Sequence, residues 1–384
     1  MSQIDDSKET GAGRRDFLKT TGAVTAGAAL LSGCLGGSGG SGTSTTEVVT
    51  PSESDPLTFS SFGGAFKTVL DEQLFQPFSE ETGYPIESQP QGGTAEMLPK
   101  LQSAVQGGSA PVDVAIVTVP GLYRGRNSDI WMTWEESDFE NLQYISDDLI
   151  NTNDQGMIDG VGSMGWFINL VHNTEAVSEG PSSWTSLWDS AYEDQMAMMT
   201  PAVTGYMPDI TAAVHFDGQE TLSTEEGLNK VFQKLAEVKP QAQMWYTNEA
   251  NFQSKLKDGS VPMGMLYNDI TIVLQENGAP VESTFVEEGS VLGSGRWVSP
   301  KTSQKTEAIR EFIDYASQPE VQDRIAENLY TVPAIESQYT TLSDETYERI
   351  AGPGIEEAIQ PNFKMYVERQ ETINQMWNEL IVQS

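Results

Sequence analysis

The stretch that decides the fold is LTFSSFGG at residues 57–64. Its first six residues alternate like those of a β-strand, and the two glycines end that strand. Apolar side chains then recur at helical spacing from Phe66 to Phe78. A strand, a glycine turn and a helix in this order begin an α/β unit.

A second unit of the same kind follows directly. Residues 85–89 are predicted to form a strand, Gly92-Gly93-Thr94 a turn, and residues 95–106 a helix. The run VDVAIV at residues 112–117 is typical of a strand that is buried on both faces. Two adjoining units of this type predict an α/β fold with largely parallel strands.

The same alternation continues through the rest of the chain. Asn268-Asp269 is predicted to cap one of these helices. Predicted strands lie at 163–171, 196–200, 262–267 and 289–298, and predicted helices at 224–238, 270–277, 306–316 and from Pro319 onward. A chain of 384 residues is long enough for two such domains.

The N-terminus carries export and anchoring signals. Arg14-Arg15 precedes a short apolar run at residues 20–31, the pattern of a twin-arginine signal peptide. The sequence LSGC at residues 31–34 resembles the lipobox of secreted lipoproteins, which implies that Cys34 is lipidated. The apolar run is too short and too rich in glycine and alanine to favour the alternative of a membrane-spanning helix.

The charge is strongly negative. There are 56 acidic and 21 basic residues, giving a net charge of −35. Such a charge argues against nucleic-acid binding. Two interpretations remain, an acidic surface for cationic partners and a general adaptation to very salty surroundings, where charges are screened over a few ångströms. The acids are spread along the whole chain, which favours the second.

Cysteine and histidine are scarce. Cys34 is the only cysteine, so the chain contains no intramolecular disulfide and no cysteine cluster for a metal. We expect no cofactor and no metal. Nucleophilic catalysis with a histidine base would need His172 or His215.

Several stretches resemble the substrate-binding proteins of ABC importers, in the group of the spermidine/putrescine-binding proteins. They are FGGAF at 62–66, QPFSEETG at 76–83, VDV at 112–114, PSSWTSLWD at 181–189 and QPEVQ at 318–322. The resemblance covers roughly residues 57 to 335. It implies a two-lobed periplasmic-binding-protein-like fold of type II, with mixed or parallel sheets flanked by helices and joined by a hinge.

The resemblance also implies a function and an organisation. A small solute, by default a polyamine such as spermidine or putrescine, is captured between the lobes and delivered to a membrane permease. We expect a monomer, anchored by lipid on the extracellular face of the membrane after twin-arginine export. The expected segments are a signal peptide at 1–33, a tether at 34–55, lobe 1 at 56–165, lobe 2 at 166–288, and a return crossing with C-terminal helices at 289–384.

The expected binding site lies beyond the carboxyl ends of the strands. Glycines at a helix start let backbone amides approach a ligand, and aromatic walls favour cations. The candidates are Phe62, Gly63, Gly64, Thr94, Thr118, Tyr206, Trp245, Tyr267, Asp269 and Arg296. For each aromatic residue, packing in the core is the alternative, and Asp269 either pairs with a solute amine or caps its helix.

The chain departs from the polyamine binders at three positions. Where they carry carboxylates, an approximate match places Ala202, Gly205 and Gly295. Arg296, next to the third position, points instead to a carboxylate or phosphate on the solute. The alternatives from other classes are an anchored hydrolase of the glycosidase kind, which needs only two carboxylates, and a structural surface module.

Overall fold

The computed structural model describes residues 49–200 and 206–382. Ten strands form its sheet, and their bounds are β1 (Leu57–Phe62), β2 (Ile86–Gln91), β3 (Val114–Thr118), β4 (Ile150–Thr152), β5 (Ile158–Asn173), β6 (Met196–Met199), β7 (Ala242–Tyr246), β8 (Met263–Tyr267), β9 (Val281–Thr284) and β10 (Val291–Val298). Hydrogen bonds connect them in the order β2-β1-β3-β10-β5-β8-β6-β7, and β4 and β9 also pair with β5.

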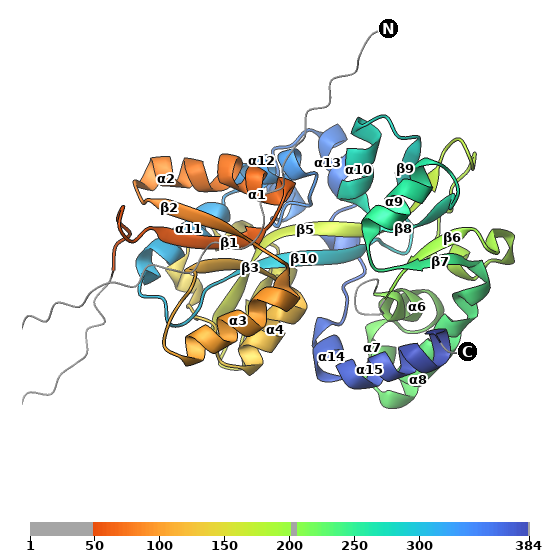
Figure 1. The fold of residues 1–384 in the computed structure, drawn as a ribbon, viewed down its shortest axis with the longest axis horizontal. Coiled ribbons are helices and arrows are strands. Elements are labelled where there is room, and N and C mark those ends of the chain that lie inside the picture. The colour runs from red at the N-terminus through yellow and green to blue at the C-terminus, as the bar shows by residue number, and fades with distance from the viewer. Residues whose placement is uncertain (1–48, 201–205, 383–384) are drawn as a thin grey trace, which may run out of the picture. The chain divides into compact units, whose positions relative to one another are not determined.

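The helices surround this sheet (Figure 1). In the first part of the chain they are α1 (Ala65–Leu70), α2 (Gln76–Thr82), α3 (Thr94–Gln106) and α4 (Val119–Asn127), with a π-helical segment at Asp71–Phe75 between α1 and α2. In the middle they are α6 (Met207–His215), α7 (Gln219–Leu222), α8 (Glu225–Leu235), α9 (Glu249–Lys257) and α10 (Asn268–Glu276). The last five are α11 (Thr306–Ala316), α12 (Pro319–Leu329), α13 (Asp344–Ala351), α14 (Phe363–Glu368) and α15 (Gln370–Trp377).

Two long strands join two halves of the sheet. The first half of β5 pairs with β10 and its second half with β8 and β9, all antiparallel. β10 pairs in turn with β3. Within each half, β1 with its neighbours β2 and β3, and β6 with β7 and β8, are parallel. We call the half around β1 lobe 1 and the half around β6 lobe 2. Because β5 serves both, the expected two sheets form one hydrogen-bonded path.

Each lobe has its own apolar core. The core of lobe 2 contains Met198, Phe232 and Phe252, and it also includes Tyr366 and Trp377 from the C-terminal helices. Lobe 1 has a cluster around Phe59 and Phe312 and a second one around Leu101 and Trp131. Burial of these side chains is the main source of stability in the described part of the chain.

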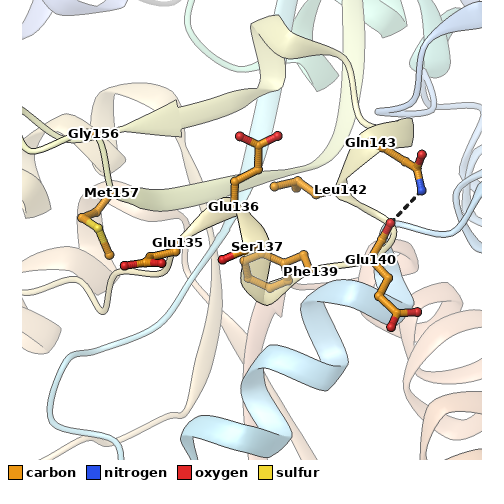
Figure 2. Close-up of a pocket in the computed structure, with 9 residues that line it drawn as sticks. All are labelled: Glu135, Glu136, Ser137, Phe139, Glu140, Leu142, Gln143, Gly156 and Met157. Carbon is orange, nitrogen blue, oxygen red and sulfur yellow. Dashed lines mark hydrogen bonds between the residues drawn. The ribbon is translucent and has the colours of Figure 1, made fainter.

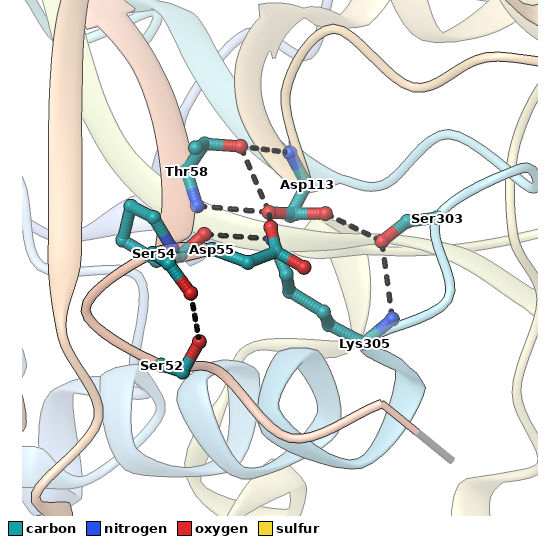
Figure 3. Close-up of polar contacts among 8 residues, drawn as sticks. Ser52, Ser54, Asp55, Thr58, Asp113, Ser303 and Lys305 are labelled. Carbon is teal, nitrogen blue, oxygen red and sulfur yellow. Dashed lines mark hydrogen bonds and ion pairs between the residues drawn. The ribbon is translucent and has the colours of Figure 1, made fainter. Parts of the chain in front are cut away.

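A buried ion pair fixes the start of the folded body in lobe 1 (Figure 3). Lys305 Nζ lies 3.0 Å from Asp113 Oδ2 and 2.7 Å from Asp55 Oδ1. Asp113 also accepts hydrogen bonds from Thr58 and Ser303. Val49 N donates to Gln304 O, so residues 49–55, the end of the expected tether, already contact the body.

Several element boundaries differ from the sequence-based expectation. The predicted positions are correct for the strand at 57–62 and for the helices at 306–316 and from Pro319, because the apolar periodicity of these segments is strong. Strand β7 was missed, since its one fully buried residue, Tyr246, leaves little alternation. The predicted cap of α10 is wrong: Tyr267 occupies the cap position, and Asn268 Nδ2 donates to Arg349 O and Ile350 O.

Candidate functional site

A pocket of about 610 Å³ lies where residues of both lobes meet. Its volume is within the range of typical small-molecule sites. Lobe 1 and the crossing strand β5 contribute an aromatic wall with two glycines, and lobe 2 contributes a wall with two carboxylates. The lining residues are Phe62, Phe66, Gly92, Gly93 and Trp166 on the first wall, and Glu249, Tyr267, Asp269 and Ile270 on the second.

Asp269 is the most informative of these residues. Strand β8 ends at Tyr267, and α10 begins immediately after it, so Asp269 lies in the first turn of that helix. Its side chain is 9% exposed, and its Oδ1 has no hydrogen-bond partner among the described residues. Burial raises the pKa of Asp269 to about 7, against the lowering effect of the backbone amides at 269 and 270. The pocket is therefore lined by a buried carboxylate, one of whose oxygens has no hydrogen-bond partner among the described residues.

Two neighbours complete the acidic wall. Glu249 is the first residue of α9, whose N-terminus is capped by Asn248 through the Ala250 amide at 2.9 Å. Burial raises the pKa of Tyr267 well above 10, and the negative charges of Glu249 and Asp269 act in the same direction. The Tyr267 hydroxyl thus stays protonated at neutral pH, so it remains able to donate a hydrogen bond.

The opposite wall is aromatic. The rings of Phe62 and Phe66 meet edge to face at 6.0 Å, and those of Phe62 and Trp166 at 6.4 Å. Gly293 of β10 makes room for the indole, because a Cβ there would lie 2.0 Å from Trp166 Nε1. Aromatic faces of this kind attract cations.

The turn before α3 brings backbone to the pocket. Gly93 has φ +99°, a conformation that side chains rarely adopt, and α3 starts at the next residue. The Thr118 amide donates to Thr94 Oγ1 at 3.0 Å, which holds the end of β3 to the start of α3. Thr94 and Thr118, both expected in the site, are therefore engaged with each other and are not among the pocket-lining residues.

The remaining candidates lie in different surroundings. Gly63 and Gly64 follow Phe62 at the edge of the pocket, and Gly64 has φ +66° before α1. Tyr206 packs edge to face against Phe363 and Tyr366 at 5.6 and 5.8 Å. Trp245 packs against Trp377 of α15 at 5.5 Å. For Trp245 and Tyr206, the alternative of packing against the C-terminal helices accounts for the contacts.

Arg296 lies inside lobe 1 and is 2% exposed. Its guanidinium donates to Asn151 Oδ1 at 2.5 Å, Ser294 Oγ at 2.9 Å and the carbonyls of Gly295 and Asp148 at 3.0 and 3.2 Å. Burial lowers its pKa to about 9. These bonds connect β10 to Asn151 of β4 and to Asp148 just before it, so Arg296 is left out of the proposed site. Nothing in the sequence around residue 296 distinguishes a buried arginine from a solute ligand.

Several predictions lie outside the described residues, namely the signal peptide at 1–33, the tether as far as residue 48 with Cys34, and the positions Ala202 and Gly205. The expectation also missed Phe66, Trp166 and Glu249. Phe66 was assigned to the helix core, and Glu249 follows the strand that was not predicted. Trp166 carries the one signal that was available, an aromatic residue within a predicted crossing strand.

A second hollow of about 710 Å³ lies on lobe 1 alone (Figure 2). All its lining residues come from the segment 135–157, among them Glu135, Glu136 and Glu140. Gln143 Nε2 donates to Glu140 O at 2.9 Å. Because lobe 2 contributes nothing to it, this hollow is a less suitable site for a solute held between lobes.

Two further observations limit the chemistry of the described residues. Within 49–200 and 206–382, no group of three or more acidic, histidine or cysteine side chains is placed to hold a metal ion. Over the same ranges, no helix combines the length and the apolar character needed to cross a bilayer.

Comparison with known proteins decides the family. A model described as bacterial extracellular solute-binding protein matches residues 73–349, more than half of the chain. The chain belongs to this family. Its solute-binding relatives include the gamma-aminobutyric acid-binding protein of Pseudomonas aeruginosa, 24% identical over 85% of this chain and 91% of the relative. The spermidine/putrescine-binding periplasmic protein of Escherichia coli is 20% identical over 68% of this chain and 73% of the relative.

Solved structures of solute-binding proteins share the fold. An ABC transporter protein from Clostridium perfringens has a TM-score of 0.70 at 22% identity, covering 85% of this chain and 99% of its own. The spermidine/putrescine substrate-binding protein of Streptococcus pneumoniae has a TM-score of 0.66 at 17% identity, with coverages of 85% and 98%. The predicted two-lobed α/β fold is confirmed. This solute-binding protein is a component of an ABC transporter and not an enzyme, which sets aside the hydrolase alternative.

Proposed function

We propose that this solute-binding protein captures a small solute that carries an ammonium group and presents it to an ABC permease. The single observation that carries the proposal is that Asp269 lines the pocket and has a buried Oδ1 without a hydrogen-bond partner among the described residues. A buried carboxylate is costly unless a cation or several donors compensate it. A solute ammonium supplies both the charge and the N–H groups.

The other lining residues support a cationic solute. The pocket lining contains two carboxylates and no lysine or arginine. Phe62, Phe66 and Trp166 offer aromatic faces to the same space. Polyamines and gamma-aminobutyric acid, named for the two relatives, both carry an ammonium group, so the relatives agree on this feature. From the expected site we retain Phe62, Tyr267 and Asp269, with Gly63 and Gly64 beside them.

The test is a binding screen by thermal unfolding and calorimetry in molar salt. Primary amines, among them putrescine, spermidine and n-butylamine, are expected to raise the melting temperature, because a ligand that binds only the folded state stabilises it. Uncharged alcohols and dicarboxylates of the same length are the matched controls. Stabilisation by the controls alone would refute the proposal.

We also propose that the protein is exported by the twin-arginine route and anchored through lipid on Cys34. The motifs at Arg14-Arg15 and at residues 31–34 support this. A tethered receptor holds its solute at high local concentration near the permease. A Cys34→Ser variant is expected to appear in the medium, and an Arg14→Lys, Arg15→Lys variant to stay inside the cell. Retention of the Cys34→Ser variant on the membrane would refute the anchor.

The acidic composition supports adaptation to high salt. With a net charge of −35, self-repulsion destabilises the compact state at low ionic strength. The melting temperature is therefore expected to rise steeply from 0.1 M to multimolar salt. In the same samples, light scattering tests whether the protein is a monomer. We also propose that the lobes divide near residues 165 and 288 and close around the solute. X-ray scattering with and without ligand tests this closure.

A further inference from the structure

The lobe 1 wall of the pocket contains a group that the proposed function does not use. Helix α3 has 13 residues, and its start adjoins Gly92 and Gly93, which line the pocket. In the part of the chain that the structure describes, no hydrogen bond engages the amides of Thr94 or Ala95 as donors, and no side chain caps the helix. The N-terminus of a helix carries a partial positive charge and open N–H groups.

A second observation in the same pocket points to a ligand. The carboxylate of Asp269 is nine-tenths buried, and its Oδ1 lacks a partner. Asp269 and Glu249 belong to lobe 2, whereas the start of α3 belongs to lobe 1. The two walls thus present opposite electrical signs, with Phe62, Phe66 and Trp166 on the wall opposite the carboxylates.

We infer that the solute is an amino acid whose amine and carboxylate lie at opposite ends of a short apolar chain. Its ammonium group pairs with Asp269, and its carboxylate accepts hydrogen bonds from the first amides of α3. This inference rests on the proposed function, since it names the class of solute for the same pocket. A solute that contacts both lobes in this way stabilises the closed arrangement.

The lobe 1 wall is poorly suited to a second ammonium group. None of its lining residues is acidic, and the partial positive charge at the start of α3 repels a cation. Glu96, in the first turn of α3, has its side chain close to Gly92 and is paired with Lys100 at 2.8 Å. Glu96 weakens the attraction of α3 for a carboxylate, which makes it a useful probe.

A four-carbon series tests the inference by calorimetry in molar salt. The ligands are 4-aminobutanoate, n-butylamine and putrescine, which share the ammonium group and differ only at the other end. We expect 4-aminobutanoate to bind at least about tenfold more tightly than n-butylamine, and putrescine no more tightly than n-butylamine. Equal or tighter binding of putrescine relative to 4-aminobutanoate overturns the inference and leaves the proposed function intact. Binding of none of the three overturns both.

The Glu96→Gln variant gives an independent measurement. It removes a negative charge near the start of α3, so affinity for 4-aminobutanoate is expected to rise by about two- to fivefold while affinity for n-butylamine stays unchanged. Glu81 is an exposed acid near the end of α2. Glu81→Gln is the matched control and is expected to change the affinity for neither ligand. An equal change for both ligands in Glu96→Gln contradicts a carboxylate subsite at α3.

Discussion

Two buried aspartates, one in each lobe, have opposite surroundings. Asp113 of lobe 1 is 5% exposed and accepts hydrogen bonds from Thr58 N, Thr58 Oγ1, Ser303 Oγ and Lys305 Nζ, at 2.6 to 3.0 Å (Figure 3). Asp269 of lobe 2 is 9% exposed, and within the part of the chain that the structure describes its pocket is lined by no lysine or arginine and its Oδ1 has no hydrogen-bond partner.

This difference in hydrogen-bond partners distinguishes a carboxylate that stabilises the fold from one that we propose binds the solute. Although burial opposes it, the hydrogen bonds to Asp55 and Asp113 raise the pKa of Lys305 and keep its charge inside lobe 1. The cost of burying Asp113 is therefore met within the fold. The cost of burying Asp269 is met only in part, by the backbone amides at 269 and 270, and we propose that the solute compensates the rest. Charge compensation inside lobe 1 stabilises the fold, and incomplete compensation at the pocket between the lobes marks the proposed binding site.

The largest expected effect comes from breaking the pair in lobe 1. Lys305→Met leaves Asp113 buried without its cation, and the free energy of unfolding is expected to fall by about 3–5 kcal/mol. Urea unfolding in molar salt measures it. Lys301→Met, which removes an exposed pair with Asp129, is the control and is expected to cost at most about 1 kcal/mol. Equal effects of the two variants would contradict the structural role of the buried pair.

Arg296 extends the comparison to the crossing strand. Arg296→Met leaves two buried acceptors, Ser294 Oγ and Gly295 O, without this donor, so the free energy of unfolding is expected to fall by about 2–3 kcal/mol. Because these bonds lie inside lobe 1, the affinity for an amine solute is expected to stay within about twofold of wild type. A loss of affinity without a loss of stability would indicate that Arg296 contributes to solute binding.

The aromatic wall is expected to contribute less. Trp166→Ala removes one face for cation–π contact, and the affinity for an amine is expected to fall about tenfold. Trp166→Phe retains an aromatic face and is expected to recover most of it. Calorimetry on both variants measures these affinities. Equal affinities of Trp166→Ala and wild type would contradict a contribution of the aromatic wall to cation binding.

Much of the fold follows from local patterns. The alternation in β1 and the helical spacing in α11 and α12 are strong enough to locate those elements. The pairing of β5 with both lobes is not local, because residues 158–173 form one strand only through partners up to 136 residues away, as in the pair Val161–Trp297. The sequence therefore predicts two lobes but not the continuous sheet.

The site was predictable only in part. Tyr267 ends a strand with a clear apolar signal and Asp269 comes just after it, so the rule that ligands bind beyond strand ends leads to two residues that line the proposed pocket. The same rule proposes Thr118, which instead donates its amide to Thr94. Trp245 and Arg296 were misleading for another reason: both are suited to contact a ligand, and only the tertiary packing shows that they are engaged elsewhere.

The smallest expected effect is a pH dependence. Because the pKa of Asp269 is about 7 in the folded free protein, above its usual 3.8, this group stabilises the free fold below pH 3.8 and loses that contribution as pH rises to about 7. Amine affinity has the opposite trend, since binding needs the carboxylate. Between pH 8 and pH 7 it is expected to fall about twofold, and more steeply below. An affinity that stays the same from pH 8 to pH 6 would contradict the assignment of Asp269 as the carboxylate that binds the amine.

Asp269→Asn tests the central claim most directly, when affinity and stability are measured on the same preparation at pH 8. The substitution removes a buried charge that the free protein compensates only in part. We expect the free variant to unfold at the same or a higher urea concentration than wild type, while its affinity for an amine solute falls about 100-fold. A variant that loses stability and keeps its affinity would show that Asp269, like Asp113, serves the fold.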